Sequence, residues 1–540
     1  MDSNFTLPRV TLIALLEIML LKEYPEARPS QMSLPALAAA ILAIHYISLL
    51  IWLMFIYPFY FHPLRNFPAP KYTLISRTWR RIRTKTPPGQ LLLEVAESTP
   101  NDGIIVVQGH STHLVITKPG PLADILVHRP YDFAKLDSVR EFLQQSLGDG
   151  LIAVEGDRHK FMRKNTQPAF KFSQIKELYP MMWKIAVTFT EILKGELQGA
   201  EGGLVEMSRW SGKATLDIIG LAAFGRNFRS IENPDDALVR NYEEIFRPKK
   251  SKFAYFILMR TFPRRLVNML PWDVARMFKE TMANIRAICA QMVKEKREAI
   301  AKKEENHVDI LSLLIKSDNF SETELIDQML TFMAAGHETT ASVLTWTTYL
   351  LALHPSWQSD LRSELRRALP DFPWLPAGTD LASVLEHLPH LNGILNESLR
   401  LYPTVPVTLR GAVRDTTISG HAVPKGTEII MSPWVVNRYT ALWGPDATEF
   451  RPGRWITTVN GEKKANNTGG AASNYAQLTF LHGPRGCIGQ GFARAELRCL
   501  IAAFVMQFGW ELGMDPREVV PGGVITNKPV NGLRLKLKTV

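Results

Sequence analysis

Cysteine is scarce in this chain: its 540 residues include three, Cys289, Cys487 and Cys499. Their number is odd and none of them has Cys-x-x-Cys spacing, so the sequence supports neither a disulfide framework nor a zinc ribbon. Cys289 and Cys499 stand in apolar helical contexts, where a small buried hydrophobic side chain is the expected role. We therefore expect the folded part of the chain to face a reducing compartment.

Signals for binding nucleotides and nucleic acids are also missing. The chain has no Gly-x-Gly-x-x-Gly unit for a nicotinamide cofactor, and the 53 residues after Cys487 are too few for a flavin domain. The formal net charge is +11, but no basic–aromatic repeat accompanies it, which argues against a nucleic-acid partner. A membrane surface and an acidic protein partner explain this charge better.

Charge is absent from one long stretch, residues 36–57. These 22 residues contain no Asp, Glu, Lys or Arg and are long enough to span a bilayer. A cleaved signal peptide is a weaker interpretation, because the stretch begins after 35 residues and is too long for a signal core. An earlier apolar stretch, residues 10–21, is shorter and contains Glu17, so we expect an interfacial or signal-like helix there.

Basic residues crowd the chain after this stretch, at Arg65, Lys71, Arg77, Arg80, Arg81, Arg83 and Lys85. The positive-inside rule then places residues 1–35 in the lumen, residues 36–57 in the bilayer and residues 72–540 in the cytosol. Four prolines make residues 58–71 a stiff hinge that is not expected to continue the helix. In this orientation Asn4, in the triplet Asn4-Phe5-Thr6, is available for a glycan.

The pattern beyond the hinge predicts a mainly α domain with small β-sheets. A long helix is expected to begin at Ser321, which forms a capping box with Glu324, and to end before Pro355. Residues 103–117 alternate apolar and polar side chains around Gly109 and predict a hairpin. Other segments are expected as follows: mostly helical over 167–315, short strands within 408–430 and 523–538, and a mobile surface insertion over 457–475.

One cysteine has a different context from the other two. The backbone can fold closely around an anionic sulfur of Cys487, because small residues stand at Gly483, Gly486 and Gly489. We interpret this loop as a haem-iron site. Arg485 adds a positive charge that can hold a haem carboxylate, and Phe480 can lie against the sulfur and shield it from water. The alternative is a buried cysteine in a glycine-rich loop, which a lone Cys-x-Gly would favour.

The string Phe-x-x-Gly-x-Arg-x-Cys-x-Gly resembles the signature of the cytochrome P450 family at every fixed position. The resemblance implies that Cys487 is the axial thiolate ligand of a haem b iron. A thiolate ligand pushes electron density onto the iron and favours O–O cleavage, so the implied chemistry is oxygen activation.

A second motif lies in the middle of the long predicted helix, where Gly336 costs about 1 kcal/mol relative to alanine. Ala335 and Thr339 share a helical face, so small atoms at positions 335 and 336 would make room for a ligand beside the Thr339 hydroxyl. The alternative is a helix-packing glycine with a solvated Glu338. The heptapeptide resembles the oxygen-binding helix of the family, which implies that Thr339 hydrogen-bonds iron-bound dioxygen or its water and that Glu338 helps to deliver protons.

Glu397 and Arg400 lie three residues apart on one helical face and can pair. A chance surface pair of this kind would contribute little. Here Arg454 and then the cysteine loop follow in the order found in the family, and the resemblance implies a buried structural triad of Glu397, Arg400 and Arg454. Gly453 departs from the family pattern, which often has an acidic residue there, but Arg454 is retained.

A third group concerns the haem carboxylates. His159 and Arg163 share a helical face, and the family more often has Trp at the position of His159. Either ring can donate an N–H to a haem propionate, and Arg163 can pair with the same group. Arg410 is a further expected propionate partner. The alternative for this segment is a basic amphipathic helix that holds no ligand.

The resemblance covers residues 63–540 and implies a cytochrome P450 fold and a monooxygenase that oxidises a lipophilic small molecule with O2. Electrons would come from NADPH through a separate flavoprotein, NADPH–cytochrome P450 reductase, with cytochrome b5 as a further expected partner. The anchor and hinge resemble those of fungal endoplasmic-reticulum enzymes, held in membrane lipid by a single span with a cytosolic catalytic domain. Secondary-metabolite biosynthesis, acting on a terpenoid, polyketide or alkaloid, is the expected setting.

Three other functions remain open from the sequence: a fatty-acid or xenobiotic hydroxylase, a haem-thiolate isomerase or dehydratase that needs no reductase, and a non-enzymatic haem-binding membrane protein. The isomerase is disfavoured because related isomerases tend to lose the Glu-Thr pair or alter the cysteine loop. The resemblance also implies a largely apolar substrate lining from residues 132–147, 225–271, 332–335, 405–409 and 525–527.

Overall fold

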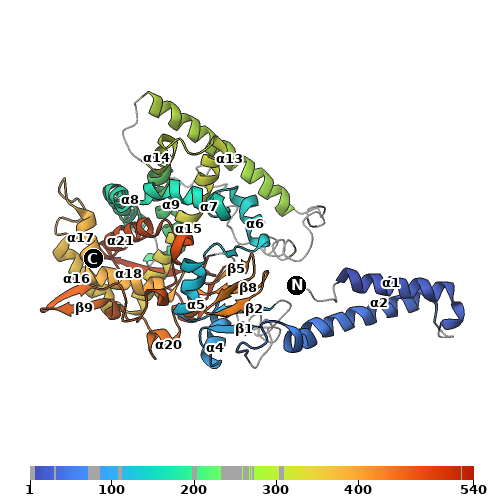
Figure 1. Cartoon of the computed structure of the whole chain (residues 1–540). Coiled ribbons are helices and arrows are strands. Elements are labelled where there is room, and N and C mark those ends of the chain that lie inside the picture. The colour runs from blue at the N-terminus through green and yellow to red at the C-terminus, as the bar shows by residue number, and fades with distance from the viewer. Residues whose placement is uncertain are drawn as a thin grey trace.

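The computed structural model describes residues 7–28, 32–70, 86–107, 112–197, 203–232, 258, 267, 269, 273–302, 309–523 and 526–540. Helices dominate the body and small sheets lie at its edges, as Figure 1 shows, which confirms the predicted mainly α class. Gly109 and most of the expected lining segment 225–271 lie outside the described residues.

Two helices precede the body and project from it side by side (Figure 1). They are α1 (Leu7–Glu23) and α2 (Leu34–Ile51), and α2 is long and apolar enough to cross a membrane. The helix was expected to end at the first proline, Pro58, but a π-helical segment, Trp52–Phe61, continues through it. His62 N–H donates to Tyr57 O at 2.9 Å, an i to i+5 bond of the kind that defines a π-helix.

The long predicted helix is α15, Glu322–Leu353, and it runs through the middle of the core. Its capping box is confirmed: the Ser321 hydroxyl accepts from Glu324 N–H, and the Glu324 carboxylate accepts from Ser321 N–H. Three helices pack against it, α9 (Met207–Phe224), α13 (Asp273–Ala301) and α21 (Gln490–Gln507), and α8 (Phe172–Leu197) packs on α21 and α9. Cys289 and Cys499 are buried in this core, as predicted.

The largest sheet has the strand order β1-β2-β8-β5-β3. Strands β1 (Ile104–Val107) and β2 (His113–Ile116) form the predicted hairpin, and β2 pairs in parallel with β8 (Glu428–Met431). The short strand β3 (Phe133–Ala134) pairs with β5 (Thr408–Ala412), which sets Ala134 opposite Gly411. This pairing brings the residues that follow β3 close to Arg410.

The other elements surround this core. The helices are α4 (Gln90–Ser98), α5 (Pro119–Ala123), α6 (Asp137–Leu147), α7 (Gly156–Thr166), α13 (Asp273–Ala301), α14 (Ile310–Lys316), α16 (Pro355–Ala368), α17 (Leu381–His387), α18 (Pro389–Leu401), α19 (Pro433–Val436) and α20 (Thr440–Trp443). The strands are β4 (Leu204–Glu206), β6 (Thr416–Ile418), β7 (His421–Val423), β9 (Ile456–Val459), β10 (Glu462–Ala465), β11 (Phe508–Leu512), β12 (Pro521–Gly522), β13 (Lys528–Pro529) and β14 (Arg534–Thr539).

The segment 457–475, expected to be a mobile insertion, begins instead as an ordered hairpin of β9 and β10. Its turn is Asn460-Gly461, both with positive φ (54° and 84°), which is the preferred sequence for a two-residue hairpin turn. Further on, Gly469 packs so closely on Trp455 that an added Cβ would lie 2.8 Å from the indole ring. The sequence-based prediction weighed composition and overlooked the Asn-Gly pair, so it missed this hairpin.

Candidate active site

The loop that carries Cys487 closes on itself through its backbone. Cys487 N–H donates to Phe480 O at 2.8 Å, and Gly486 N–H donates to Gly483 O at 3.0 Å. Gly483 has φ of +70°, and a Cβ there would overlap the carbonyl oxygen of Leu126, so this position requires glycine. The ring of Phe480 lies against the guanidinium of Arg494 at 5.6 Å.

Cys487 is exposed, whereas the other two cysteines are buried. Protein atoms nevertheless surround much of its thiol, and this burial raises the pKa of Cys487, while a Gly489 backbone N–H and the charge of Arg163 act to lower it. Gly489 is also the N-cap of α21, so the positive end of an 18-residue helix dipole lies beside the sulfur. These groups favour a thiolate over a thiol once a metal is present.

Arg163 and His159 come from α7 and were expected to hold a haem carboxylate. In the structure Arg163 Nη1 donates instead to Gly486 O at 2.7 Å and so ties α7 to the cysteine loop. His159 is buried, with Nδ1 3.1 Å from the Tyr131 hydroxyl. Burial and then the nearby charge of Arg485 lower the pKa of His159 to about 4, so its ring is neutral near pH 7.

Buried cations gather beside this loop around a single carboxylate, Glu155. Lys135 donates to Glu155 Oε1 from its backbone N–H at 2.9 Å and from Nζ at 3.2 Å, and Arg485 pairs with Glu155 Oε2. Burial lowers the pKa of Lys135 to about 8 and that of Arg410 to about 10. Positive charge therefore exceeds negative charge in this buried group.

A ligand with two carboxylates would offset this excess of positive charge. Arg410 donates only to neutral oxygens, Thr408 Oγ1 at 3.1 Å and Leu409 O at 2.8 Å, and Arg485 Nε has no hydrogen-bond partner among the described residues. Uncompensated buried cations are costly unless an anion joins them. The residues present thus fit the propionates of a haem. The sequence gave no signal for Lys135 or Glu155. Lys135 comes close to Arg410 only through the pairing of β3 with β5, which are far apart in the sequence.

The predicted oxygen-binding motif lies on α15. Thr339 Oγ1 donates to Ala335 O at 2.5 Å, Thr404 Oγ1 donates to Thr339 O at 3.2 Å, and the Ala335 side chain is exposed. Gly336 was expected to make room for a ligand, but its space belongs to Ile219 of α9, whose Cδ1 would lie 2.7 Å from an added Cβ. The helix-packing explanation of Gly336 is therefore the correct one.

Glu338 is not simply solvated. Its Oε1 accepts from Lys528 Nζ of β13 at 2.6 Å, and its side chain is 13% exposed. The sequence gave no signal for this ion pair, because its members are 190 residues apart.

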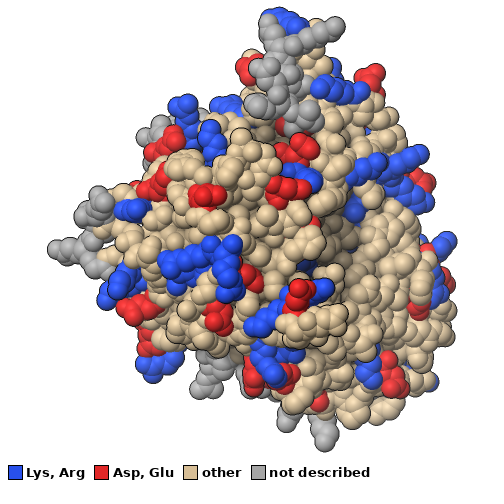
Figure 2. Space-filling view, turned by 90° about the vertical axis from the view of Figure 1, so that its left-hand side faces the viewer, with Lys and Arg blue, Asp and Glu red and all other residues tan. Residues whose placement is uncertain are grey.

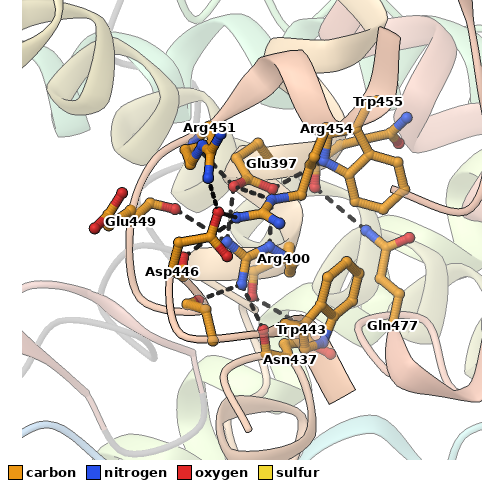
Figure 3. Close-up of polar contacts among 12 residues, drawn as sticks. Glu397, Arg400, Asn437, Trp443, Asp446, Glu449, Arg451, Arg454, Trp455 and Gln477 are labelled. Atoms are coloured by element: carbon orange, nitrogen blue, oxygen red, sulfur yellow. Dashed lines mark hydrogen bonds and ion pairs between the residues drawn. The ribbon is translucent and has the colours of Figure 1, made fainter. Parts of the chain in front are cut away.

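The triad residues meet around Glu397, as Figure 3 shows. Glu397 accepts from Arg400 Nη2 at 2.7 Å and from Arg454 Nε at 3.0 Å, and both Glu397 and Arg400 are fully buried. Arg451 N–H and Trp455 Nε1 also donate to Glu397, at 2.9 and 2.8 Å. Burial acts to raise the pKa of Glu397, but the hydrogen bonds and charges of the arginines hold it below its usual range.

The two halves of the site lie on elements that touch. Behind Cys487, α21 packs against α15, and an added Cβ on Gly489 would lie 3.9 Å from the Phe170 ring. That ring meets Phe332 of α15 at 5.5 Å, one turn before Ala335. The thiol in its closed loop and the Thr339 hydroxyl on α15 thus belong to one region.

Comparison with known proteins decides the family. The family model described as Cytochrome P450 matches residues 79–533. The chain belongs to the cytochrome P450 family. Its relatives include Cytochrome P450 monooxygenase sphH of Aspergillus fumigatus, 41% identical over 92% of each chain. They also include Cytochrome P450 monooxygenase ptmK of Penicillium ochrochloron, 37% identical over 90% of this chain and 95% of that protein.

Cytochrome P450 monooxygenase FUM15 of Gibberella moniliformis is a third relative, 34% identical over 92% of this chain and 91% of that protein. Membership of this fungal group makes the chain a P450 monooxygenase that works with a haem, a cysteine thiolate ligand and electrons from a redox partner. This outcome confirms the predicted family, enzyme class and cofactor.

Proposed function

We propose that this P450 inserts one atom of O2 into a lipophilic small molecule, with Cys487 as the haem-iron ligand and electrons from a separate NADPH-dependent flavoprotein. The observation that carries the proposal is that Cys487 alone of the three cysteines is exposed, in a loop flanked by buried cations that lack enough anions. When bound, the haem supplies oxygen activation, for which a thiolate ligand is suited.

The buried cations hold the propionates in this proposal. Arg410, Arg485 and Lys135 provide positive charge, and His159, neutral near pH 7, provides a ring N–H. Arg163 acts through the loop, because it fixes the Gly486 carbonyl and adds positive charge near Cys487. Phe480, Gly483 and Gly489 shape the backbone that surrounds the sulfur.

Thr339 and Glu338 handle protons at the oxygen side. The Thr339 hydroxyl is held at the Ala335 carbonyl and can turn its lone pairs or its proton toward a bound water. Glu338, fixed by Lys528, can exchange protons with such a water. An intact Glu-Thr pair favours the monooxygenase over a haem-thiolate isomerase or dehydratase.

An apolar substrate suits the described part of the expected lining. Phe332 is buried, and Ala335 and Val405 present apolar exposed side chains. We propose a terpenoid, polyketide or alkaloid intermediate of a fungal secondary metabolite as the substrate, with a fatty acid or a xenobiotic as the alternative. The matched P450s of filamentous fungi support this order.

We place the enzyme at the endoplasmic reticulum, with residues 36–57 in the bilayer and the catalytic domain, residues 72–540, in the cytosol. The support is the apolar helix α2 followed by the basic segment. The redox partner is NADPH–cytochrome P450 reductase, with cytochrome b5 as an additional donor.

A carbon monoxide difference spectrum tests the ligand. The reduced enzyme should show the red-shifted Soret band of a thiolate-ligated haem, and Cys487→Ser should abolish it. Cys499→Ser, a change to a buried cysteine of α21, should keep it. A red-shifted band in Cys487→Ser would exclude Cys487 as the ligand.

Turnover tests the reaction class. With purified reductase and an accepted substrate, NADPH and O2 should disappear as an oxygenated product forms. Product formation without reductase would support the isomerase, and haem binding without any product would support a non-enzymatic haem protein.

A further inference from the structure

Helices α1 and α2 form an antiparallel pair that extends from the body (Figure 1). The turn between them lies at the far end, and the start of α1 points back toward the body. Val10 and Ala14 of α1 are buried, as are Leu37 and Leu49 of α2. The pair therefore packs as a helical hairpin.

The polar side chains of the pair meet each other. Glu17 Oε1 lies 3.4 Å from His45 Nε2, and Thr11 Oγ1 lies 3.1 Å from the Tyr46 hydroxyl. At the turn, Arg28 Nε donates to Leu21 O at 2.5 Å and Nη2 donates to Lys22 O at 3.0 Å, which satisfies the last carbonyls of α1. Glu17, the one acid within the apolar stretch of α1, thus has a partner on α2.

The outward faces are apolar on both helices. Six side chains of α1 are 45–64% exposed, namely Leu12, Ile13, Leu15, Leu16, Met19 and Leu20. Four of α2 are 47–61% exposed, namely Ile44, Ile47, Leu50 and Ile51. Water disfavours a contiguous apolar surface of this kind, and a helix lying flat on a membrane would keep one charged face. Glu17 is 46% exposed, but its carboxylate is paired with His45 of the other helix. Polar side chains that pair with one another, among outward side chains that are mostly apolar, are the arrangement that hydrocarbon favours.

We infer that α1 crosses the bilayer beside α2, so that the two helices form a transmembrane hairpin with its turn in the lumen and the residues before α1 in the cytosol. The inference rests on the membrane anchoring in the proposed function and extends it by a second span. It replaces the interfacial helix and the luminal residues 1–35 that the sequence alone led us to expect.

The dimensions and charges agree with two spans. The 17 residues of α1 measure about 25 Å, at the short end for a span, and Arg9 and Lys22 near its ends can extend their charges to the interfaces. The turn segment carries Lys22, Glu23, Glu26 and Arg28, whose charges cancel, whereas the segment after α2 is strongly basic. The positive-inside rule then places the turn in the lumen.

Cysteine labelling in sealed microsomes tests the hairpin. Ser3→Cys and Glu26→Cys are each introduced into the full chain and treated with a membrane-impermeant maleimide before and after permeabilisation, against the wild-type background. Ser3→Cys should react in sealed vesicles, and Glu26→Cys should react only after permeabilisation. Protection of both positions in sealed vesicles would restore the single span and overturn the inference, as would reaction of Glu26→Cys in sealed vesicles or a glycan at Asn4.

Alkaline carbonate extraction separates this inference from the anchoring on which it rests. The chain should remain in the membrane pellet in every variant. Release into the supernatant would show that neither helix anchors the protein, and the proposed location would fail together with the hairpin. Retention with both labelling positions protected would leave the anchor in place and remove α1 from the bilayer.

Discussion

Lys135 is a basic side chain at a largely buried position, where burial disfavours its charged form. Two cations, Lys135 and Arg485, share Glu155, and the pKa of Lys135 falls to about 8 as a result of burial, despite that carboxylate. A haem propionate would supply the missing negative charge, so haem binding and protonation of Lys135 should be linked.

We predict that haem affinity depends on the protonation of Lys135. Below pH 8 the haem-free protein holds a lysine ammonium that can pair with a propionate, whereas above pH 8 the proton must be taken up on binding. Affinity should therefore be complete below pH 8 and fall above it, by at most about tenfold per pH unit. Haem titration of the haem-free protein between pH 6.5 and 9.5 measures this.

Lys135→Arg is the matched control, because arginine keeps its charge over this range. Its affinity should stay level where that of the wild type falls. Equal pH profiles for the two proteins would show that Lys135 does not hold the haem.

Thr339 is the residue on which we expect oxygen chemistry to depend. Thr339→Ala should leave haem binding and substrate affinity largely intact, because among the described residues the hydroxyl hydrogen-bonds only to Ala335 O. Oxygen that is reduced but not protonated at the right atom leaves as hydrogen peroxide, so the ratio of product to NADPH should fall about tenfold while NADPH use continues.

The measurement is product, NADPH and peroxide together in one reaction. Thr339→Ser keeps a hydroxyl and should retain most of the coupling. Unchanged coupling in Thr339→Ala would remove Thr339 from proton delivery.

Residues inside short motifs could be predicted from the sequence, and their distant partners could not. Cys487, Thr339 and Glu397 each stand at a spacing that a helix or a tight loop requires. Lys528 and Glu155 reach the site through strand pairing and loop packing over long stretches of chain. Their spacing along the sequence carries no signal.

At the scale of elements, α18 is joined to the segment before β9 by Glu397 and its donors (Figure 3). A buried carboxylate surrounded by two arginines, a backbone N–H and an indole N–H has its hydrogen bonds filled. Breaking one member leaves a buried charge without a counter-ion, which costs more than the intact pair contributes.

We predict that Glu397→Gln destabilises the enzyme by about 3–5 kcal/mol, because the Arg400 guanidinium stays buried without its carboxylate. The loss should appear as a lower temperature at which the thiolate carbon monoxide spectrum disappears. Arg517→Ala removes an arginine from an exposed pair with Asp515 and should leave that temperature unchanged. If the Glu397→Gln enzyme were as stable as the wild type, the triad would not have the structural role that we assign to it.

The elements themselves differed in how well the sequence predicted them. The start of α15 was predictable because its cap is local, and the first hairpin because two short runs rich in β-branched residues, 104–107 and 113–116, stand close together in the sequence. The expected alternation is absent, since all four residues of each strand are buried. The end of the anchor helix was not, because a π-helical segment absorbs Pro58. The prediction that Gly336 makes room for a ligand failed for a related reason, because Ile219, whose side chain fills that space, belongs to another helix.

At the scale of the whole molecule, the formal net charge is +11. On the face that Figure 2 shows, most groups of Lys and Arg have Asp or Glu beside them. A shallow hollow beside the cysteine loop differs, since it is lined by Tyr131, Lys160, Arg163, Lys164, Gln167, Pro168, Lys171 and Pro484. None of these side chains is acidic.

This hollow indicates which basic residues would meet the reductase. Arg158, Lys160 and Lys164 of α7 are all exposed, but Arg158 pairs with Glu324 and Lys160 pairs with Asp157. Lys164 and Lys171 are exposed on the rim of the hollow, near the loop of Cys487. An acidic protein surface would be drawn to these two lysines.

We predict that the double change Lys164→Glu and Lys171→Glu slows reduction of the haem by the reductase about tenfold at low salt, because it reverses two charges beside the cysteine loop. The wild-type rate should fall as salt rises, and the double variant should depend on salt much less. Stopped-flow reduction under carbon monoxide measures both rates.

Lys463→Glu with Lys464→Glu, on the hairpin of β9 and β10, reverses as many charges away from the hollow and should leave the rate unchanged. Turnover driven by added peroxide needs no reductase and should survive in every variant, so a matching loss of that activity would point to a damaged fold, and an unchanged reduction rate would place the docking surface elsewhere.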